Sequence, residues 1–441
     1  MIIVMVLAIS KLKLHPFLAI MGAALLLAFA ALPLGAIPGS FGSGFAGTFS
    51  SLGLVIILGA MIGILLEKTG AALSMADAVV KFAGKKHPDL AMLLMGWIVS
   101  IPVFCDSGFV ILNPIRKALA KRTGCPPVTM AIALSAGLYT AHVFIPPTPG
   151  PVAAAGYLGL ENNMLLVIGT GVLISIPVLL AGWLFASRIG KKVTAEDIDT
   201  EISYQDLIQN AGKLPPVWIS LVPIALPVIL MALKSVASLL KISGLPGELI
   251  NFAGTPMMAL ACGLIIAIMI FSASGKREDF YKLSDETLRV VGPILFVTAG
   301  GGVLGKIISD AGIVSYIIHH IPGLTGISII FPFLIAALLK TSQGSSTVAI
   351  TTTAGIMGLY NAENSLMVAL NLTTPVSAAL TVMAIGAGAM TVSHANDSYF
   401  WVVTNFSGIK VQDGYRTQTL CTLVMGITAI LFIWLINFLI Q

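Results

Sequence analysis

The stretch HVFIPPTPGP, residues 142–151, interrupts a long apolar run and decides how the chain folds. Its four prolines, all between residues 146 and 151, remove N–H donors and free carbonyl groups, so no continuous helix can pass through. Lipid offers no partner to such groups, and non-helical backbone survives at membrane depth only where it is buried or lines a cavity. The stretch therefore predicts a broken membrane helix whose break lies beside a cavity.

Three more polar segments rich in Gly or Ser interrupt the apolar runs, so that each half of the chain carries two. They are CDSG (105–108) in the first half, and KTSQGSST (340–347) and SHANDS (393–398) in the second. Corresponding broken segments in two halves are the best sequence pointer to the substrate site of a transporter. We expect all four segments to meet at one site.

The composition identifies an integral membrane protein. Of the 441 residues, 57% are hydrophobic and 10% are charged, whereas about 25% are charged in ordinary globular domains. The apolar runs are continuous and lack strand alternation, which predicts an all-α polytopic protein rather than a barrel. The Lys and Arg residues are scattered between the spans, which argues against nucleic-acid binding. The four cysteines show no paired spacing that would suggest a disulfide or a metal site.

The positions of the charges predict the topology. All but four of the 24 Lys and Arg residues fall on the cytoplasmic side, as the positive-inside rule requires. The exceptions are Lys234, Lys241, Lys306 and Lys340. The chain is then divided into an N-terminal half (1–187), a cytoplasmic linker (188–214) and a C-terminal half (215–441).

Each half is predicted to contain a re-entrant helical hairpin and a discontinuous transmembrane helix. The hairpins are expected at Ala91–Leu119 and Ile329–Met357, and the broken helices at Pro126–Leu160 and Leu366–Phe406. Because the same parts cross in opposite directions, the two halves form an inverted repeat. The other expected features are surface helices at Ala71–Ala83 and Ile313–Ile321, a Gly/Ser-rich external loop between Leu34 and Leu52, and a second external loop holding Lys234, Lys241 and Glu248.

Matching glycines support the repeat. Residues Gly59, Gly63 and Gly70 have the same spacing as a second set in the other half. A face of small residues lets membrane helices approach closely. The second set is Gly301, Gly305 and Gly312.

Five ionisable residues are expected at membrane depth: Asp106, His142, Lys340, His394 and Asp397. A charge at the bilayer centre costs roughly 2.5–3.5 kcal/mol or more, so each is a functional candidate. Lys340 is the best cation for a substrate carboxylate, and the other four are candidates to carry a proton. Structural roles stay open: a helix cap for Asp106, an interfacial lysine for Lys340 and a buried, hydrogen-bonded ring for His142.

The neighbouring polar residues are candidates to bind substrate. The turn at Ser107 and Gly108 would present backbone amides to an anionic group. The second hairpin tip would present polar side chains to a polyhydroxylated ligand, unless these side chains only form hydrogen bonds with the backbone of the tip itself. The predicted substrate-binding set is Ser107, Gly108, Thr148, Lys340, Gln343, Gly344, Ser345, Ser346, Thr347 and Asn396, with no metal ligand.

These motifs resemble a known family. The tip at Cys105–Ile111, PPTPGP at 146–151, QGSSTVA at 343–349, and SHAND at 393–397 with Phe400-Trp401 are similar to the gluconate:proton symporter (gluconate permease, GntP-type) family. The resemblance covers nearly the whole chain. It implies an ion-transporter-type fold with usually dimeric assembly, and proton-coupled uptake of sugar acids across a bacterial inner membrane.

Two departures from the family pattern leave the particular substrate open. Family members commonly have Glu-Val-Gly where this chain has Asp106-Ser107-Gly108, and His where it has Thr148. D-Serine carriers of the family usually lack the Ser-His-x-Asn-Asp pattern, so its presence favours a hydroxy acid over an amino acid. The alternatives are a D-serine or other small hydroxy or dicarboxylic acid symporter and, remotely, an intramembrane enzyme, for which no residue spacing gives support.

The expected function is therefore secondary active, proton-coupled uptake of gluconate or a related aldonate by a multi-pass protein of a bacterial inner membrane. No cofactor is expected, with the proton as coupling ion. The expected partners are a small anionic sugar acid, protons, membrane lipid and a second copy in a homodimer, and no nucleic acid.

Overall fold

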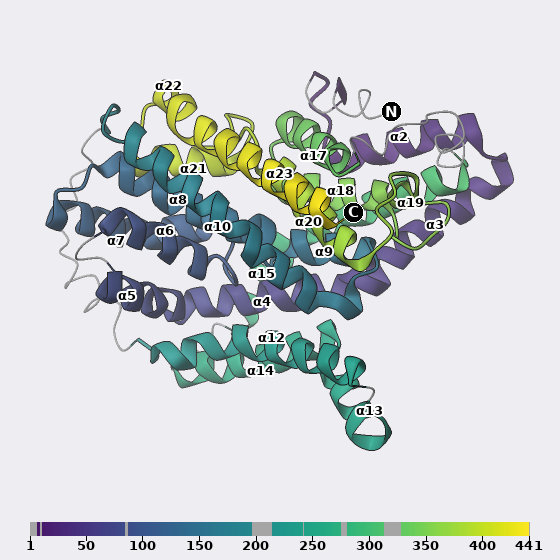
Figure 1. The fold of residues 1–441 in the computed structure, drawn as a ribbon, viewed down its shortest axis with the longest axis horizontal. Helices are drawn as coiled ribbons and strands as arrows, with labels where there is room; N and C mark the ends of the chain where they lie inside the picture. Colours follow the sequence, from purple (N-terminus) through teal and green to yellow (C-terminus); the bar gives the residue numbers. More distant parts are fainter. Residues whose placement is uncertain are drawn as a thin grey trace.

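The computed structural model describes residues 7–8, 11–83, 87–195, 214–240, 242–274, 280–312 and 328–440. Every regular element in this part of the chain is a helix, which confirms the predicted all-α class. Among the described residues, six helices are long and apolar enough to cross a membrane, or seven if the bent pair of α4 and α5 forms one span. The helices form one elongated bundle, with α12 and α14 side by side along one edge (Figure 1).

The first two apolar segments, which were predicted to span the membrane, are joined by a helix and not by the expected loop. Helix α2 (Pro16–Ala31) is followed by α3 (Ile37–Thr48), a π-helical turn (Phe49–Gly53) and α4 (Leu54–Lys68). The glycines that suggested a loop lie in this helix, and one of them, Gly44, lets α3 pack tightly on α15. A Cβ on Gly44 would lie 2.8 Å from the Cα of Val303, so only glycine allows this approach.

The first predicted hairpin is present. Helix α5 (Ala71–Ala83) is followed by α6 (Pro88–Val99) and α7 (Cys105–Thr123), with the turn at residues 100–104. The 12 residues of α6 rise roughly 18 Å, too short for a bilayer core of about 30 Å. A helix of this length that turns back before crossing has the form of a re-entrant hairpin.

The stretch 142–151 breaks a helix as predicted. Helix α8 (Pro127–Phe144) ends before the prolines and α9 (Pro149–Tyr157) begins within them. Nearly all residues of both helices are buried inside the bundle. Helix α10 (Met164–Ile189) follows at the surface of the bundle, and the chain continues in irregular structure to residue 195. The rest of the expected linker lies outside the described residues.

The second half begins with α12 (Val217–Leu239), α14 (Pro256–Ala273) and α15 (Phe280–Asp310). The expected loop between the first two is mainly the helix α13 (Gly244–Ala253), which projects from the bundle, and Lys234 lies within α12 (Figure 1). The helix expected at Ile313–Ile321 lies outside the described residues.

The second hairpin and the second broken helix are also present. Helices α17 (Ile330–Gln343) and α18 (Ser346–Met357) form the hairpin. The expected broken helix does not start at Leu366, because α19 (Leu366–Ala369) is a separate turn. The break falls between α20 (Pro375–Met390) and α21 (Ser398–Ser407). The last elements are α22 (Val411–Gly414), a π-helical turn (Tyr415–Thr419) and α23 (Leu420–Ile440).

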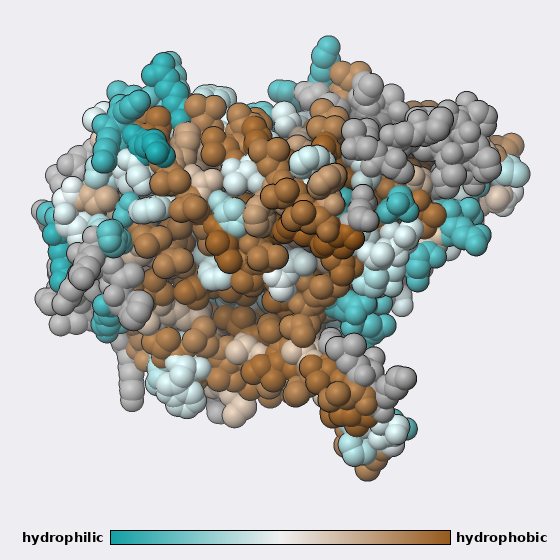
Figure 2. All heavy atoms as spheres, viewed as in Figure 1, coloured by the Kyte–Doolittle hydropathy of each residue, from teal (hydrophilic) through white to brown (hydrophobic). Residues whose placement is uncertain are grey.

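The outer surface is suited to lipid. Apolar side chains cover most of the face seen in Figure 2, over α10, α23 and α12. On α10, Ile176 is 61% exposed, and on α23 Leu431 is 60% exposed. Teal, hydrophilic residues gather toward the rims of this face. The chain is a multi-pass membrane protein.

The matched glycines make close contacts in both halves. A Cβ on Gly63 of α4 would lie 2.1 Å from the carbonyl oxygen of Pro102 in the first hairpin. A Cβ on Gly305 of α15 would lie 1.9 Å from that of Gly355 in the second. Gly70 and Gly312, which follow these helices, both have positive φ. The inverted relation of the two halves stays a prediction.

Candidate functional site

A cavity of about 500 Å³ lies where both hairpin tips meet the break between α20 and α21. Helices α8 and α15 complete its wall. Small-molecule sites typically measure about 300–1,000 Å³. The lining combines hydroxyl, amide, imidazole and carboxylate groups with apolar side chains, inside a bundle that is otherwise mostly apolar.

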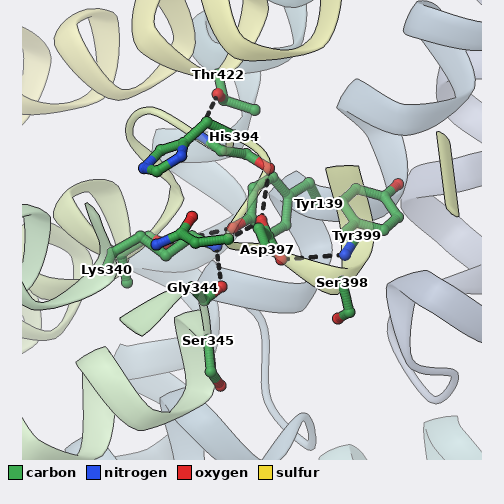
Figure 3. A network of polar contacts seen from close by, with 12 residues as sticks. Tyr139, Lys340, Gly344, Ser345, His394, Asp397, Ser398, Tyr399 and Thr422 are labelled. Carbon is green, nitrogen blue, oxygen red and sulfur yellow. Dashed lines mark hydrogen bonds and ion pairs between the residues drawn. The ribbon is translucent and has the colours of Figure 1, made fainter. Parts of the chain in front are cut away.

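Lys340 and Asp397 form a buried ion pair at the wall of this cavity. Asp397 lines the cavity, whereas Lys340 lies outside the lining. The Lys340 ammonium donates to Asp397 Oδ2 at 2.5 Å and also to the Gly344 carbonyl (Figure 3). The side chains are 0% and 5% exposed. The ammonium also lies 5.8 Å from the centre of the Tyr139 ring. Lys340 therefore has its own partners within the protein.

Asp397 organises the break before α21. As the N-cap residue it accepts a hydrogen bond from the Tyr399 N–H at 3.0 Å, and Ser393 Oγ donates to its Oδ2 at 2.5 Å. The Ser393 N–H in turn donates to Thr422 Oγ1 of α23 at 3.0 Å (Figure 3). A capping carboxylate stabilises the helix start by hydrogen bonding and by its charge. The break is thus fixed on both sides.

The second hairpin tip is joined directly to the break. Asn396 Nδ2 donates to the Thr341 carbonyl at 2.7 Å, and His394 Nε2 lies 3.1 Å from the same oxygen. Gly344, with φ of 87°, lies so close that a Cβ would be 2.0 Å from the Asn396 carbonyl oxygen. Movement of the hairpin would therefore be coupled to the break.

The first hairpin tip reaches the same break from another side. Ser398 Oγ donates to Asp106 Oδ1 at 3.2 Å, and Cys105 Sγ lies 3.5 Å from Asp106 Oδ2. The side chain of the next residue, Ser107, lies near the carboxylate of Glu67 on α4. Carboxylates thus gather around the start of α7.

Two polar atoms in the lining residues are buried without a protein partner in the described part of the chain. They are Nδ1 of His142 and Oε1 of Gln343. The other ring nitrogen of His142, Nε2, lies 3.5 Å from Thr347 Oγ1. Buried polar atoms are nearly always paired, so each of these suits a contact with a ligand.

The structure brings most of the predicted site residues to this cavity. Four do not line it: Gly108, Thr148, Lys340 and His394. Gly108 packs on Leu138, the Thr148 hydroxyl donates to the Ile145 carbonyl at 2.7 Å, and His394 bonds the second hairpin. Those that line it are Asp106, Ser107, His142, Gln343, Gly344, Ser345, Ser346, Thr347, Asn396 and Asp397. Their roles toward substrate and proton stay predictions.

Sequence reasoning missed several lining residues. Tyr139 precedes His142 by one helical turn, a spacing that could have identified it. Ser398 lies in the quoted polar segment but was not assigned a role. Val290 and Ile294 of α15 carry no sequence signal, because they resemble the other apolar residues of the span. The remaining ones are Phe104, Cys105 and Tyr399.

The short hairpins, the broken helices and a polar cavity within the bundle define a transporter of the membrane-embedded, multi-pass class. The family model for GntP family permeases matches residues 1–439, and the chain belongs to this family. It is 32% identical over 447 residues to the inner membrane permease YgbN of Escherichia coli, covering 98% of this chain and 96% of that protein. It is 29% identical to the gluconate permease of Pseudomonas aeruginosa, covering 99% and 96%.

A solved structure shares the fold. The YdaH transporter of Alcanivorax borkumensis superimposes with a TM-score of 0.68 at 14% identity, covering 96% of this chain and 99% of that chain. The chain is thus a permease and not an enzyme, as the sequence predicted.

Proposed function

We propose that this permease takes up gluconate or a related aldonate together with protons. The observation that carries the proposal is the polar cavity that the two hairpin tips and the second helix break enclose inside an apolar bundle. Its hydroxyl and amide groups, from Ser107, Gln343, Ser346, Thr347 and Asn396, suit a polyhydroxylated ligand. A relative named gluconate permease, similar along nearly its whole length, supports the substrate class.

Proton coupling requires ionisable groups at the site. The cavity lining contains Asp106, His142 and Asp397, and His394, outside the lining, contacts the Thr341 carbonyl of the second hairpin. Asp106 has only neutral hydrogen-bond donors in Ser398 and Cys105, whereas Asp397 is paired with Lys340. Asp106 is therefore the first candidate for the coupling proton. A bacterial inner-membrane location follows from the name of the E. coli relative.

The test is uptake of labelled gluconate into proteoliposomes with an imposed pH gradient. We expect accumulation when the outside is acidic and loss of accumulation with an uncoupler. Competition by unlabelled aldonates, D-serine and dicarboxylates ranks the substrates, and saturable uptake of labelled D-serine without saturable uptake of labelled gluconate would overturn the substrate class. Accumulation that ignores the uncoupler would overturn the coupling. The expected homodimer is measured separately, as the mass of the detergent-solubilised protein.

A further inference from the structure

Three helices begin at the cavity wall. They are α7 at Cys105, α18 at Ser346 and α21 at Ser398, and each is at least ten residues long. The first N–H groups of a helix have no partner within it, and the aligned peptide dipoles place a partial positive charge there. Each start could therefore hold an anionic group, but the three are not equivalent.

Two of these helix starts already carry a carboxylate. Asp397 caps α21, and Asp106 lies in the first turn of α7, with Glu67 against the following Ser107. A substrate anion placed there would meet like charge. Helix α18 has no acidic residue in its first turn, and its cap is the neutral Ser345, whose Oγ accepts only the Val348 N–H. Its earlier N–H groups, on Ser346 and Thr347, have no protein partner among the described residues and are available to a ligand.

A second observation points to the same place. His142 is 5% exposed, lines the cavity, and has no protein partner for Nδ1 in the described residues. Its other nitrogen lies 3.5 Å from Thr347 Oγ1, on the first turn of α18. In the tautomer with its proton on Nε2, the imidazole can donate a hydrogen bond to an anion at this helix start.

Lys340, the cation that the sequence favoured, is not available for this role. It is 0% exposed and occupied by Asp397 and the Gly344 carbonyl. Binding a substrate carboxylate would require it to leave a buried partner, and breaking such a pair is costly.

We propose that the carboxylate of the transported acid docks at the start of α18, on the N–H groups of Ser346 and Thr347, with the Thr347 hydroxyl and His142 beside it. The hydroxylated chain then extends toward Asp106 and Ser398, whose oxygens accept and donate hydrogen bonds. This orientation rests on the proposed function and specifies a carboxylate at one end of the ligand. A neutral polyol derivative would lose the contact that the helix start provides.

The test compares Ser345→Asp with Ser345→Asn. Asp and Asn have nearly the same size and both cap helices well, so the two variants differ mainly in one negative charge at the start of α18. The control is Thr374→Asp, at the exposed cap of α20 away from the cavity. Labelled gluconate uptake is measured in proteoliposomes, with competition by unlabelled gluconate and by its neutral amide, gluconamide.

We expect Ser345→Asp to need at least roughly tenfold more gluconate for half-maximal uptake than Ser345→Asn, because like charges oppose each other at close range. The preference for gluconate over gluconamide should fall in the same variant. Thr374→Asp should behave as the wild type. Equal affinity and equal preference in the two Ser345 variants would overturn the docking assignment while leaving the proposed function intact.

The experiments distinguish failure of the proposed function from failure of the docking assignment. Absence of aldonate uptake by the wild type overturns the proposed function and the docking assignment with it. If Ser345→Asp cannot be recovered folded, Thr347→Val replaces the hydroxyl with a methyl group of similar size. We then expect weaker gluconate binding with little change for gluconamide, and an unchanged preference would count against the assignment.

Discussion

The ammonium of Lys340 lies 2.5 Å from Asp397 Oδ2 and joins the second hairpin to the second helix break inside the bundle. Both side chains are almost fully buried. Because one partner belongs to the hairpin and the other caps α21, the pair fixes the position of two elements that form the cavity wall. The pair therefore connects the hairpin to the break, and Lys340 is not a free cation.

Removing one member of this pair should destabilise the protein strongly. Lys340→Met leaves the Asp397 carboxylate without a counter-charge, which costs about 3–5 kcal/mol. Asp397→Asn likewise leaves the Lys340 ammonium without a counter-charge. The double variant should recover much of the loss. Thermal unfolding of the purified protein measures this double-mutant cycle. The control is Arg289→Ala, which breaks the exposed pair with Asp285 and should cost no more than about 1 kcal/mol. Additive losses in the cycle would show that the two side chains do not depend on each other.

Gly344→Ala tests the contact between hairpin tip and break. The residue has φ of 87° and no room for a Cβ, which would be 2.0 Å from the Asn396 carbonyl oxygen. The matched control is Gly124→Ala, where φ is 69° and no atom lies within 4 Å of the added Cβ. In both variants the left-handed backbone conformation of the new alanine lowers the stability by about 1–2 kcal/mol. Gly344→Ala should cost a further roughly 1–3 kcal/mol for the forced shift, and should also lower uptake, whereas similar unfolding temperatures for the two variants would contradict the close contact.

Asp106→Asn tests the coupling proton. The amide keeps the shape of the carboxyl group and can still accept from Ser398, but it cannot take up a proton. We expect accumulation driven by a pH gradient to be lost, while exchange of labelled for unlabelled gluconate across the membrane continues. Asp285→Asn, at an exposed residue on α15, serves as the control and should leave both unchanged. Accumulation at the wild-type level in Asp106→Asn would remove Asp106 from the coupling step.

The hairpins and helix breaks could be predicted because proline, glycine and polar residues have few allowed places at membrane depth. Pro146 and Pro147 follow the end of α8, and Pro149 stands at the first position of α9, the one place where a helix readily accepts proline. The same reasoning failed for the segment between Leu34 and Leu52. Its glycines are loop signals in a soluble protein, whereas in this bundle they lie in the helix α3, and one of them, Gly44, allows its close contact with α15.

Which side of a helix break faces the cavity could not be predicted. Thr148 and Asn396 both follow breaks, yet the Thr148 hydroxyl turns back to the Ile145 carbonyl and Asn396 lines the cavity. A rotation of one residue decides between the two outcomes, and the sequence pattern does not specify it. The ion-pair partner of Lys340 could not be predicted either, because 57 positions separate Lys340 from Asp397 in the sequence.

The contact between α15 and the second hairpin gives a last prediction. Gly305 faces Gly355, where an added Cβ would lie 1.9 Å from a carbonyl oxygen, whereas Gly169 within α10 has no atom within 4 Å of an added Cβ. Gly169→Ala should stabilise the protein by about 0.5–1 kcal/mol, since alanine loses less backbone entropy in a helix. Gly305→Ala gains the same term but must separate two helices, so we expect a net loss of roughly 1–3 kcal/mol. Thermal unfolding of both variants measures the difference. Because helix propensity is equal at the two positions, equal stabilities would mean that α15 and α18 do not pack as closely as the structure shows.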